Sequence, residues 1–231
     1  MKAFPETVPC TVALFLLAGV LSVGAPDALA IQTVGDRALH AQRVVVRALT
    51  FMRTGYPDRA VNAYAEGLRV NPEEPVLLSG MADAQEAAGD LASARFYAAR
   101  AVEHDPDNAT YLAQLARISM AAGDMEAALE AYGRLARAAP DLLEPRLHHI
   151  DLLSRLDRLD EAVQLTDAVL EHFPRNARVL AVQVGLLHRT GQTEREIDML
   201  RRLMDVAPDP DTEYDFAIAL QRAGAPVQRR R

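Results

Sequence analysis

A proline that recurs every 34 residues limits the possible folds of this chain more than any other feature. The five prolines of this series are Pro72, Pro106, Pro140, Pro174 and Pro208. A glycine stands 17 residues before four of them, at Gly55, Gly89, Gly123 and Gly191. The matching position of the fourth unit holds Asp157, another residue type that tolerates turn conformations. Self-similarity at one fixed period predicts a stack of equal structural units.

A small residue marks a third position of the period, five residues after the glycine. The first four units carry Ala60, Ala94, Ala128 and Ala162 at this position. The fifth unit carries Glu196 instead. A position that is small in four units is expected to be a close contact between helices. We therefore expect that Glu196 turns outward or that its helix shifts.

The stretch 111–140, "YLAQLARISMAAGDMEAALEAYGRLARAAP", shows the physical content of one unit. Apolar residues recur at helical spacing on both sides of Gly123. The glycine ends the first helix, Asp124 can cap the second, and Pro140 cannot continue it. The prolines outside the 34-residue series agree with this interpretation. Pro57, Pro75 and Pro145 fall in predicted first turns, where a missing N–H costs nothing.

The prolines divide the chain into units 41–74, 75–108, 109–142, 143–176 and 177–210. A segment from about residue 34 extends the first helix, residues 211–223 form one more helix, and residues 224–231 are an expected disordered tail. In the final helix, the apolar residues expected to cover the fifth unit are Tyr214, Ala217, Ile218 and Leu220. Phe216 is expected to stay partly exposed. With aromatic residues at 5% and no tryptophan, the predicted fold class is all-α.

This pattern resembles the tetratricopeptide repeat family over nearly all of the chain after residue 30. The family has a small residue at position 8 of a 34-residue unit, alanine at position 20, an aromatic residue at position 24 and proline at position 32. Position 8 is alanine in the first three units. Tyr64 and Tyr132 stand at position 24 and are expected core residues, whereas the tryptophan of position 4 is absent. The resemblance implies a right-handed α-solenoid of about five helix-turn-helix repeats plus a C-terminal helix, with the last two helix pairs splayed further apart.

In this family the first helix of each unit lines the concave face. The resemblance therefore implies that positions 2, 5, 6, 9 and 12 of each unit line a partner-binding groove. The groove candidates are Ser79, Asp83, Glu86, Gln114, Arg117, His148, Asp151, His188 and Arg189. Any one of them can equally be part of the outward face of an ordinary helix. The lysine and asparagine clamp that some members use to hold a terminal carboxylate is absent at these positions.

Composition excludes several classes of function. Lys2 and Cys10 are the single lysine and the single cysteine of the chain. A chain that loses its N-terminus therefore has no disulfide, no cysteine nucleophile and no phosphate-loop lysine. A net charge of −7 without a basic stripe argues against nucleic-acid binding. We expect no enzyme activity, no cofactor, no metal and no small-molecule substrate.

A histidine and aspartate group offers one alternative. His148 and Asp151 share one face of a helix, and His188 lies one unit further on. Together they could form a weak metal site or a pH-sensitive patch. His149 points about 100° away from His148 and cannot share a metal with it. We favour an ordinary surface His–Asp contact over an enzyme or a metal-binding protein.

The N-terminus has the pattern of a signal peptide over residues 1–30. The apolar run 10–25 follows Lys2 and ends near Ala28-Leu29-Ala30, a small-residue site of the kind that signal peptidase accepts. We predict cleavage after Ala30 and a periplasmic or secreted protein. A run of about 16 residues is short for a membrane span, yet an uncleaved anchor stays open as an alternative.

The expected function is that of a non-catalytic scaffold or adaptor. Its partners would be other proteins or peptides, bound in the concave groove within a bacterial envelope assembly, secretion or export machine. The alternatives are a membrane-anchored receptor with an uncleaved N-terminus and a structural oligomer held by the final helix. The sequence indicates neither the partner nor the oligomeric state.

Overall fold

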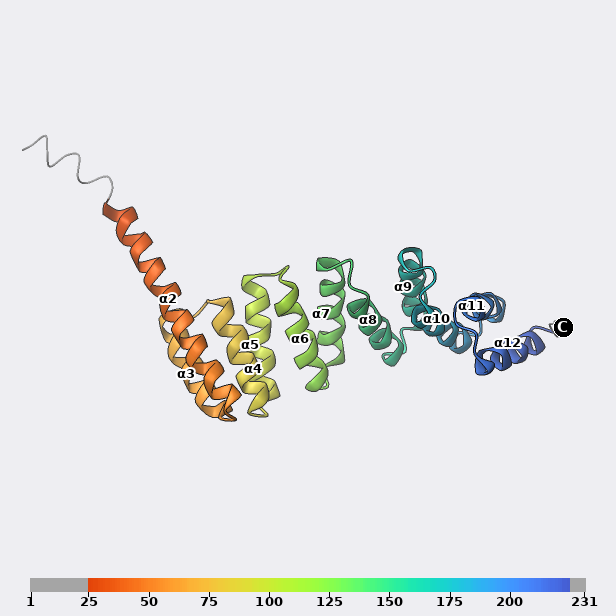
Figure 1. Cartoon of the computed structure of the whole chain (residues 1–231), viewed down its shortest axis with the longest axis horizontal. Coiled ribbons are helices and arrows are strands. Elements are labelled where there is room, and N and C mark those ends of the chain that lie inside the picture. The colour runs from red at the N-terminus through yellow and green to blue at the C-terminus, as the bar shows by residue number, and fades with distance from the viewer. Residues whose placement is uncertain (1–24, 225–231) are drawn as a thin grey trace, which may run out of the picture.

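The computed structural model describes residues 25–224, and side chains from residue 35 onward. Residues 1–24 and 225–231, which include most of the expected signal peptide and tail, lie outside this range. Within residues 25–224 all regular structure is α-helical, in eleven helices and no strand. Figure 1 shows these helices as an elongated row in which consecutive helices pack side by side. The all-α solenoid prediction is confirmed.

The helix bounds reproduce the 34-residue period. The first helices of the five units are the end of α2 (Ala25–Arg53), then α4 (Pro75–Ala87), α6 (Ala109–Ala121), α8 (Leu143–Arg155) and α10 (Ala177–Arg189). The second helices are α3 (Pro57–Val70), α5 (Leu91–His104), α7 (Met125–Ala138), α9 (Leu159–His172) and α11 (Thr193–Val206). The last helix is α12 (Pro210–Arg222). Helix α2 extends well before the first unit and projects from the stack in Figure 1.

The turn inside each unit needs a left-handed residue. The glycines at the predicted positions have φ between 69° and 86°, and Asp157 takes φ 58° in their place. In each turn the backbone N–H of the residue after the left-handed one donates to the carbonyl five residues earlier, as in Asp124 N to Ser119 O at 3.0 Å. This hydrogen bond satisfies a carbonyl at the end of the first helix, and it can form because the preceding residue is left-handed. Asp90 and Asp124 then cap the next helix by accepting from Ser93 N and Ala127 N.

The small-residue positions lie inside the stack. Ala60, Ala94, Ala128 and Ala162 are fully buried. Glu196 is also buried, at 3% exposure, so the expectation that it turns outward is wrong. Helix α11 keeps the bounds that the period predicts. Glu196 is accommodated because Arg222 of α12 donates to its Oε1 at 2.6 Å.

Three arginines join consecutive units through the period-marking prolines. Arg100 donates to the carbonyl of Pro72 at 3.1 Å, Arg134 to that of Pro106 at 3.0 Å, and Arg202 to that of Pro174 at 3.1 Å. All three arginines occupy the same position of their units. The fourth unit has Ala168 at this position, so the carbonyl of Pro140 lacks such a donor.

The last described helix has the length and the ending of a first helix of the repeat. Helix α12 has 13 residues, as α4, α6, α8 and α10 do, and it ends before Gly224 with φ 69°. Of the residues expected to cover the fifth unit, Ala217, Ile218 and Leu220 are partly buried and only Tyr214 differs, while Phe216 stays partly exposed as expected. Tyr214 is exposed, whereas Phe216 is half-buried with the guanidinium of Arg201 5.8 Å from its ring centroid.

Candidate partner-binding groove

The first helices form the inner row of the solenoid at its N-terminal end. Helix α2 packs directly on α4, and α4 on α6. Among the described residues no second helix packs as closely on the second helix of the next unit. In a curved stack the row with the closer spacing lies on the inside, so the first helices face the concave side. Beyond α6 this close contact between first helices ends, and Figure 1 shows α8 inclined to α6 and α7.

Five of the predicted groove residues come together between α4 and α6. The guanidinium of Arg117 pairs with Asp83, at 3.1 Å between Nη2 and Oδ1, and also with Glu86. The Nε2 of Gln114 donates to the carbonyl of Ser79 at 2.9 Å. Gln114 is only 7% exposed and joins the two units, so it does not present a free side chain to the groove.

The remaining predicted groove residues lie on α8 and α10. Arg189 of α10 donates to Ser154 of α8 and approaches Asp157 at 3.5 Å, joining the fourth and fifth units. Asp151 pairs with Arg155 at 2.8 Å. These residues form inter-unit and surface contacts and enclose no cavity with the cluster on α4 and α6.

The histidine and aspartate alternative finds no support in the geometry. His148 stacks on Tyr132 with ring centroids 4.8 Å apart, and Nδ1 of His188 lies 3.1 Å from Oε1 of Glu196. Asp151 is held by Arg155. Within the described part of the chain no group of three His, Cys, Asp or Glu residues could hold a metal ion.

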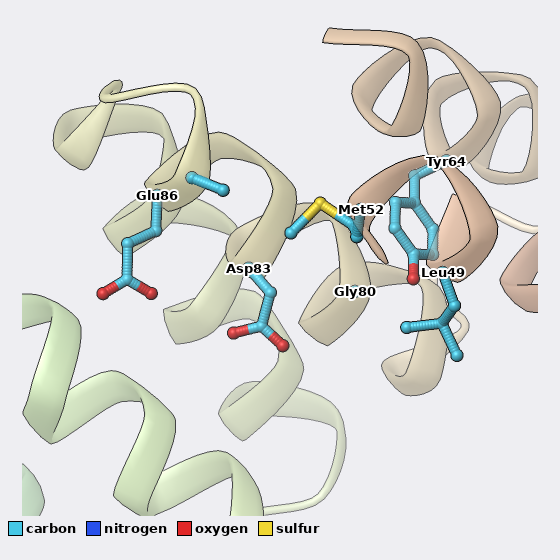
Figure 2. A pocket seen from close by; sticks show the side chains of 7 residues that line it. Leu49, Met52, Tyr64, Gly80, Asp83 and Glu86 are labelled. Atoms are coloured by element: carbon cyan, nitrogen blue, oxygen red, sulfur yellow. The ribbon is translucent and has the colours of Figure 1, made fainter. Parts of the chain in front are cut away.

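A pocket of about 380 Å³ opens between α2 and α4, and we call it the α2–α4 pocket (Figure 2). Its lining residues are Leu49, Met52, Tyr64, Gly80, Asp83, Glu86 and Ala87. Two of them, Asp83 and Glu86, belong to the predicted groove. Leu49 and Met52 occupy positions 9 and 12 of the first unit, which are among the positions expected to line the groove. The repeat pattern predicts only a core position for Tyr64.

Tyr64 and Gly80 form the floor of this pocket. A Cβ atom on Gly80 would overlap Cζ of Tyr64, so the tyrosine ring can occupy this space only because residue 80 is glycine. In Figure 2 the Tyr64 hydroxyl points to the space between Gly80 and Leu49. Burial, and secondarily the charge of Asp83, raises the pKa of the Tyr64 hydroxyl, which keeps it protonated and able to donate.

A second pocket of about 530 Å³ lies where α7 meets α8. Half-buried His149 of α8 lies against Gly133 of α7, where an added Cβ would be 3.0 Å from the imidazole Cε1. Burial, followed by the charges of Arg137 and Arg158, lowers the pKa of His149, whereas Glu161 opposes them. No motif of the sequence indicates this pocket, because its residues come from two helices and a turn.

The described helices and their packing define an α-solenoid of helix-turn-helix repeats. A sequence profile of the tetratricopeptide repeat matches residues 51–118, 87–156 and 119–186, which together span more than half of the 231 residues. The chain belongs to the tetratricopeptide repeat family. No curated protein matches its sequence. Members of this family are generally non-catalytic modules for protein interaction.

Solved structures with the same fold share little sequence with this chain. YrrB, described as a TPR protein with an unusual peptide-binding site, is 18% identical, with a TM-score of 0.57 over 78% of this chain and 90% of its own. A tetratricopeptide repeat protein from Parabacteroides merdae is 20% identical, with a TM-score of 0.59 over 80% and 74%. MamA from RS-1 is 14% identical, with a TM-score of 0.58 over 72% and 94%.

Among the helices within residues 25–224, none has both the length and the hydropathy that a membrane span needs.

Proposed function

We propose that this protein is a non-catalytic scaffold that binds a segment of a partner protein along the first helices of its N-terminal units. The observation that carries the proposal is the apolar surface beside the α2–α4 pocket. Val46 is 66% exposed and Leu49 is 54% exposed on α2, and Val76 is exposed on α4. Exposed apolar groups that share one concave surface are typical of sites for a partner chain.

Rigidity of the groove supports this proposal. The bond from the buried Gln114 side chain to the carbonyl of Ser79 joins α4 to α6 before any partner arrives. A groove that is already ordered loses little conformational entropy on binding. The peptide-binding site named for YrrB is a property of that protein, and its shared fold shows that such a solenoid can carry one.

We propose further that the protein is exported and acts in the bacterial envelope. The apolar run 10–25 and the small residues Ala28 and Ala30 of the N-terminal segment support export. Position 30 lies inside α2, so cleavage there would shorten the projecting part of this helix and leave the first unit intact. The intact mass of the exported protein tests this proposal. Retention of residues 1–30 would favour the membrane-anchored alternative.

Site-specific photo-crosslinking tests the groove. A photoreactive amino acid at Leu49, on the groove side, is expected to form a discrete adduct with a partner protein in the cells that produce this chain. The matched control places the same group at Phe96, which is exposed on the second helix α5. Equal crosslinking from both positions, or adducts from Phe96 alone, would contradict binding along the first helices.

A further inference from the structure

We infer that the α2–α4 pocket selects a basic segment, in which a large apolar side chain enters the pocket and a neighbouring Lys or Arg binds Asp83 and Glu86. This inference rests on the proposed function and specifies the chemistry of the partner.

The walls of the pocket fit one large apolar side chain. Leu49 and Met52 of α2 and Ala87 of α4 line the pocket. The Tyr64 ring lies beside Gly80 and Leu49 (Figure 2). A volume of about 380 Å³ lies near the lower end of ligand pockets. Exposed Val46 and Val76 continue the apolar surface beyond the pocket, along the path of an extended or helical segment.

The Tyr64 hydroxyl is available to a polar group of the ligand. Tyr64 as a residue is only 2% exposed, but its oxygen does not belong to the enclosed, unpartnered polar atoms of the described chain, so it is accessible from the pocket. No hydrogen bond to a described residue engages it, which leaves it free to donate. The hydroxyl faces the pocket beside Gly80, where it can donate to a backbone carbonyl of the bound segment.

The carboxylates at the pocket rim are only partly used within the protein. Arg117 contacts Oδ1 of Asp83 and Oε1 of Glu86. Within residues 35–224 no contact occupies Oδ2 of Asp83 or Oε2 of Glu86, and the three side chains together carry a net charge of −1. Carboxylates can accept several hydrogen bonds each. The rim is therefore complementary to a cation and unfavourable for an acidic segment.

The test begins with selection of random dodecapeptides displayed on phage against the full chain. Recovered sequences are expected to share a large apolar residue close to a Lys or Arg. The dissociation constant of a labelled selected peptide is then measured by fluorescence anisotropy, beside a matched peptide in which the basic residue is Glu. We expect the Glu peptide to bind at least about tenfold more weakly.

Variants of the protein separate the contributions of the rim and of the floor. Asp83→Asn combined with Glu86→Gln should weaken binding about tenfold, and Tyr64→Phe about fivefold. Arg117→Gln should strengthen binding about threefold, because it frees both carboxylates. Glu126→Gln combined with Glu130→Gln, at the pocket between α7 and α8, removes two charges elsewhere and should leave affinity unchanged. Circular dichroism confirms that each variant is folded.

The outcomes distinguish this inference from the proposed function. Selected peptides that are acidic, or whose affinity is unaffected by the rim variants, overturn the basic-segment inference while groove binding stands. An intramolecular adduct between photoreactive position 49 and residues 1–24 would make the chain's own apolar segment the occupant and overturn it as well. Failure to select any peptide, together with no adduct from position 49, counts against the proposed function itself.

Discussion

Glu196 occupies the position that alanine fills in the four preceding units, and its carboxylate is nevertheless buried. Its Oε1 accepts from Arg222 of α12 at 2.6 Å and lies 3.1 Å from Nδ1 of His188 of α10, while Oε2 is buried without a partner. A buried charge is costly unless it is paired. This residue thus exchanges tight alanine packing for a polar contact that joins three helices.

The pair of Glu196 and Arg222 gives a prediction at the scale of single residues. Arg222→Ala leaves the buried carboxylate with His188 as its one remaining partner and should lower the local stability of α11 and α12 by about 2 kcal/mol. Glu196→Ala restores the small residue of the period and should change this stability by less than about 1 kcal/mol. Hydrogen exchange of the α11 and α12 amides measures both effects. If Arg222→Ala does not speed exchange, Glu196 does not depend on this pair.

The bonds from arginine to proline carbonyls give a prediction at the scale of elements. Arg134→Ala removes a donor to Pro106 and should lower the free energy of unfolding by about 1 kcal/mol. Ala168→Arg supplies the missing donor toward Pro140 and should raise it by about 0.5 kcal/mol, since ordering the side chain offsets part of the bond. Urea denaturation measures both changes. Arg175→Ala, at an exposed loop position, is the matched control, and an equal effect there would contradict a specific role for Arg134.

The elements could be predicted from the sequence because their ends are encoded locally. Each proline of the 34-residue series follows the end of a helix, and each turn position needs a left-handed residue, which Asp157 confirms with φ 58°. The arginine recurrence was also visible, but its carbonyl partner lies 28 residues away in the preceding unit. Only the packed structure places these two groups together.

The candidate site could be predicted only in part. Asp83 and Glu86 follow from their positions in the unit, and the structure places both at a pocket. Gln114 occupies an equivalent type of position but is buried, because α4 and α6 approach closely enough for it to reach Ser79. The direction of the Tyr64 hydroxyl depends on the space that Gly80 leaves, so a rule based on repeat positions alone assigns this tyrosine to the core.

His149 makes the stability of the whole solenoid depend on pH. The folded state lowers the pKa of His149 below the ordinary histidine value of 6.5. Above that value His149 is neutral in both the folded and the unfolded chain, and the free energy of unfolding has its full value. As pH falls below that value, the unfolded chain binds a proton that the folded chain does not, and stability is lost down to the folded pKa. Arg137 and Arg158 add to this effect, and Glu161 opposes it.

His149→Gln should therefore make the urea midpoint less sensitive to pH between about 7.5 and about 5.5, the range around the ordinary histidine pKa. Wild-type protein should lose more stability over this range than the variant, because glutamine does not titrate. His104→Gln, at an exposed histidine that ends α5, should retain the wild-type pH dependence. An unchanged pH dependence in His149→Gln would show that other groups account for it.

Helix α12 and the left-handed Gly224 repeat the geometry with which the earlier first helices end. Helix α12 packs on α11 as the earlier first helices pack on the second helix before them, and a left-handed glycine follows it. A segment copied from an earlier second helix, such as the 14 residues of α7, and joined after Gly224 has a ready platform. The repeat geometry at α12 therefore offers a place where a whole repeat could be designed onto the solenoid, far along the chain from the groove residues of α2 and α4.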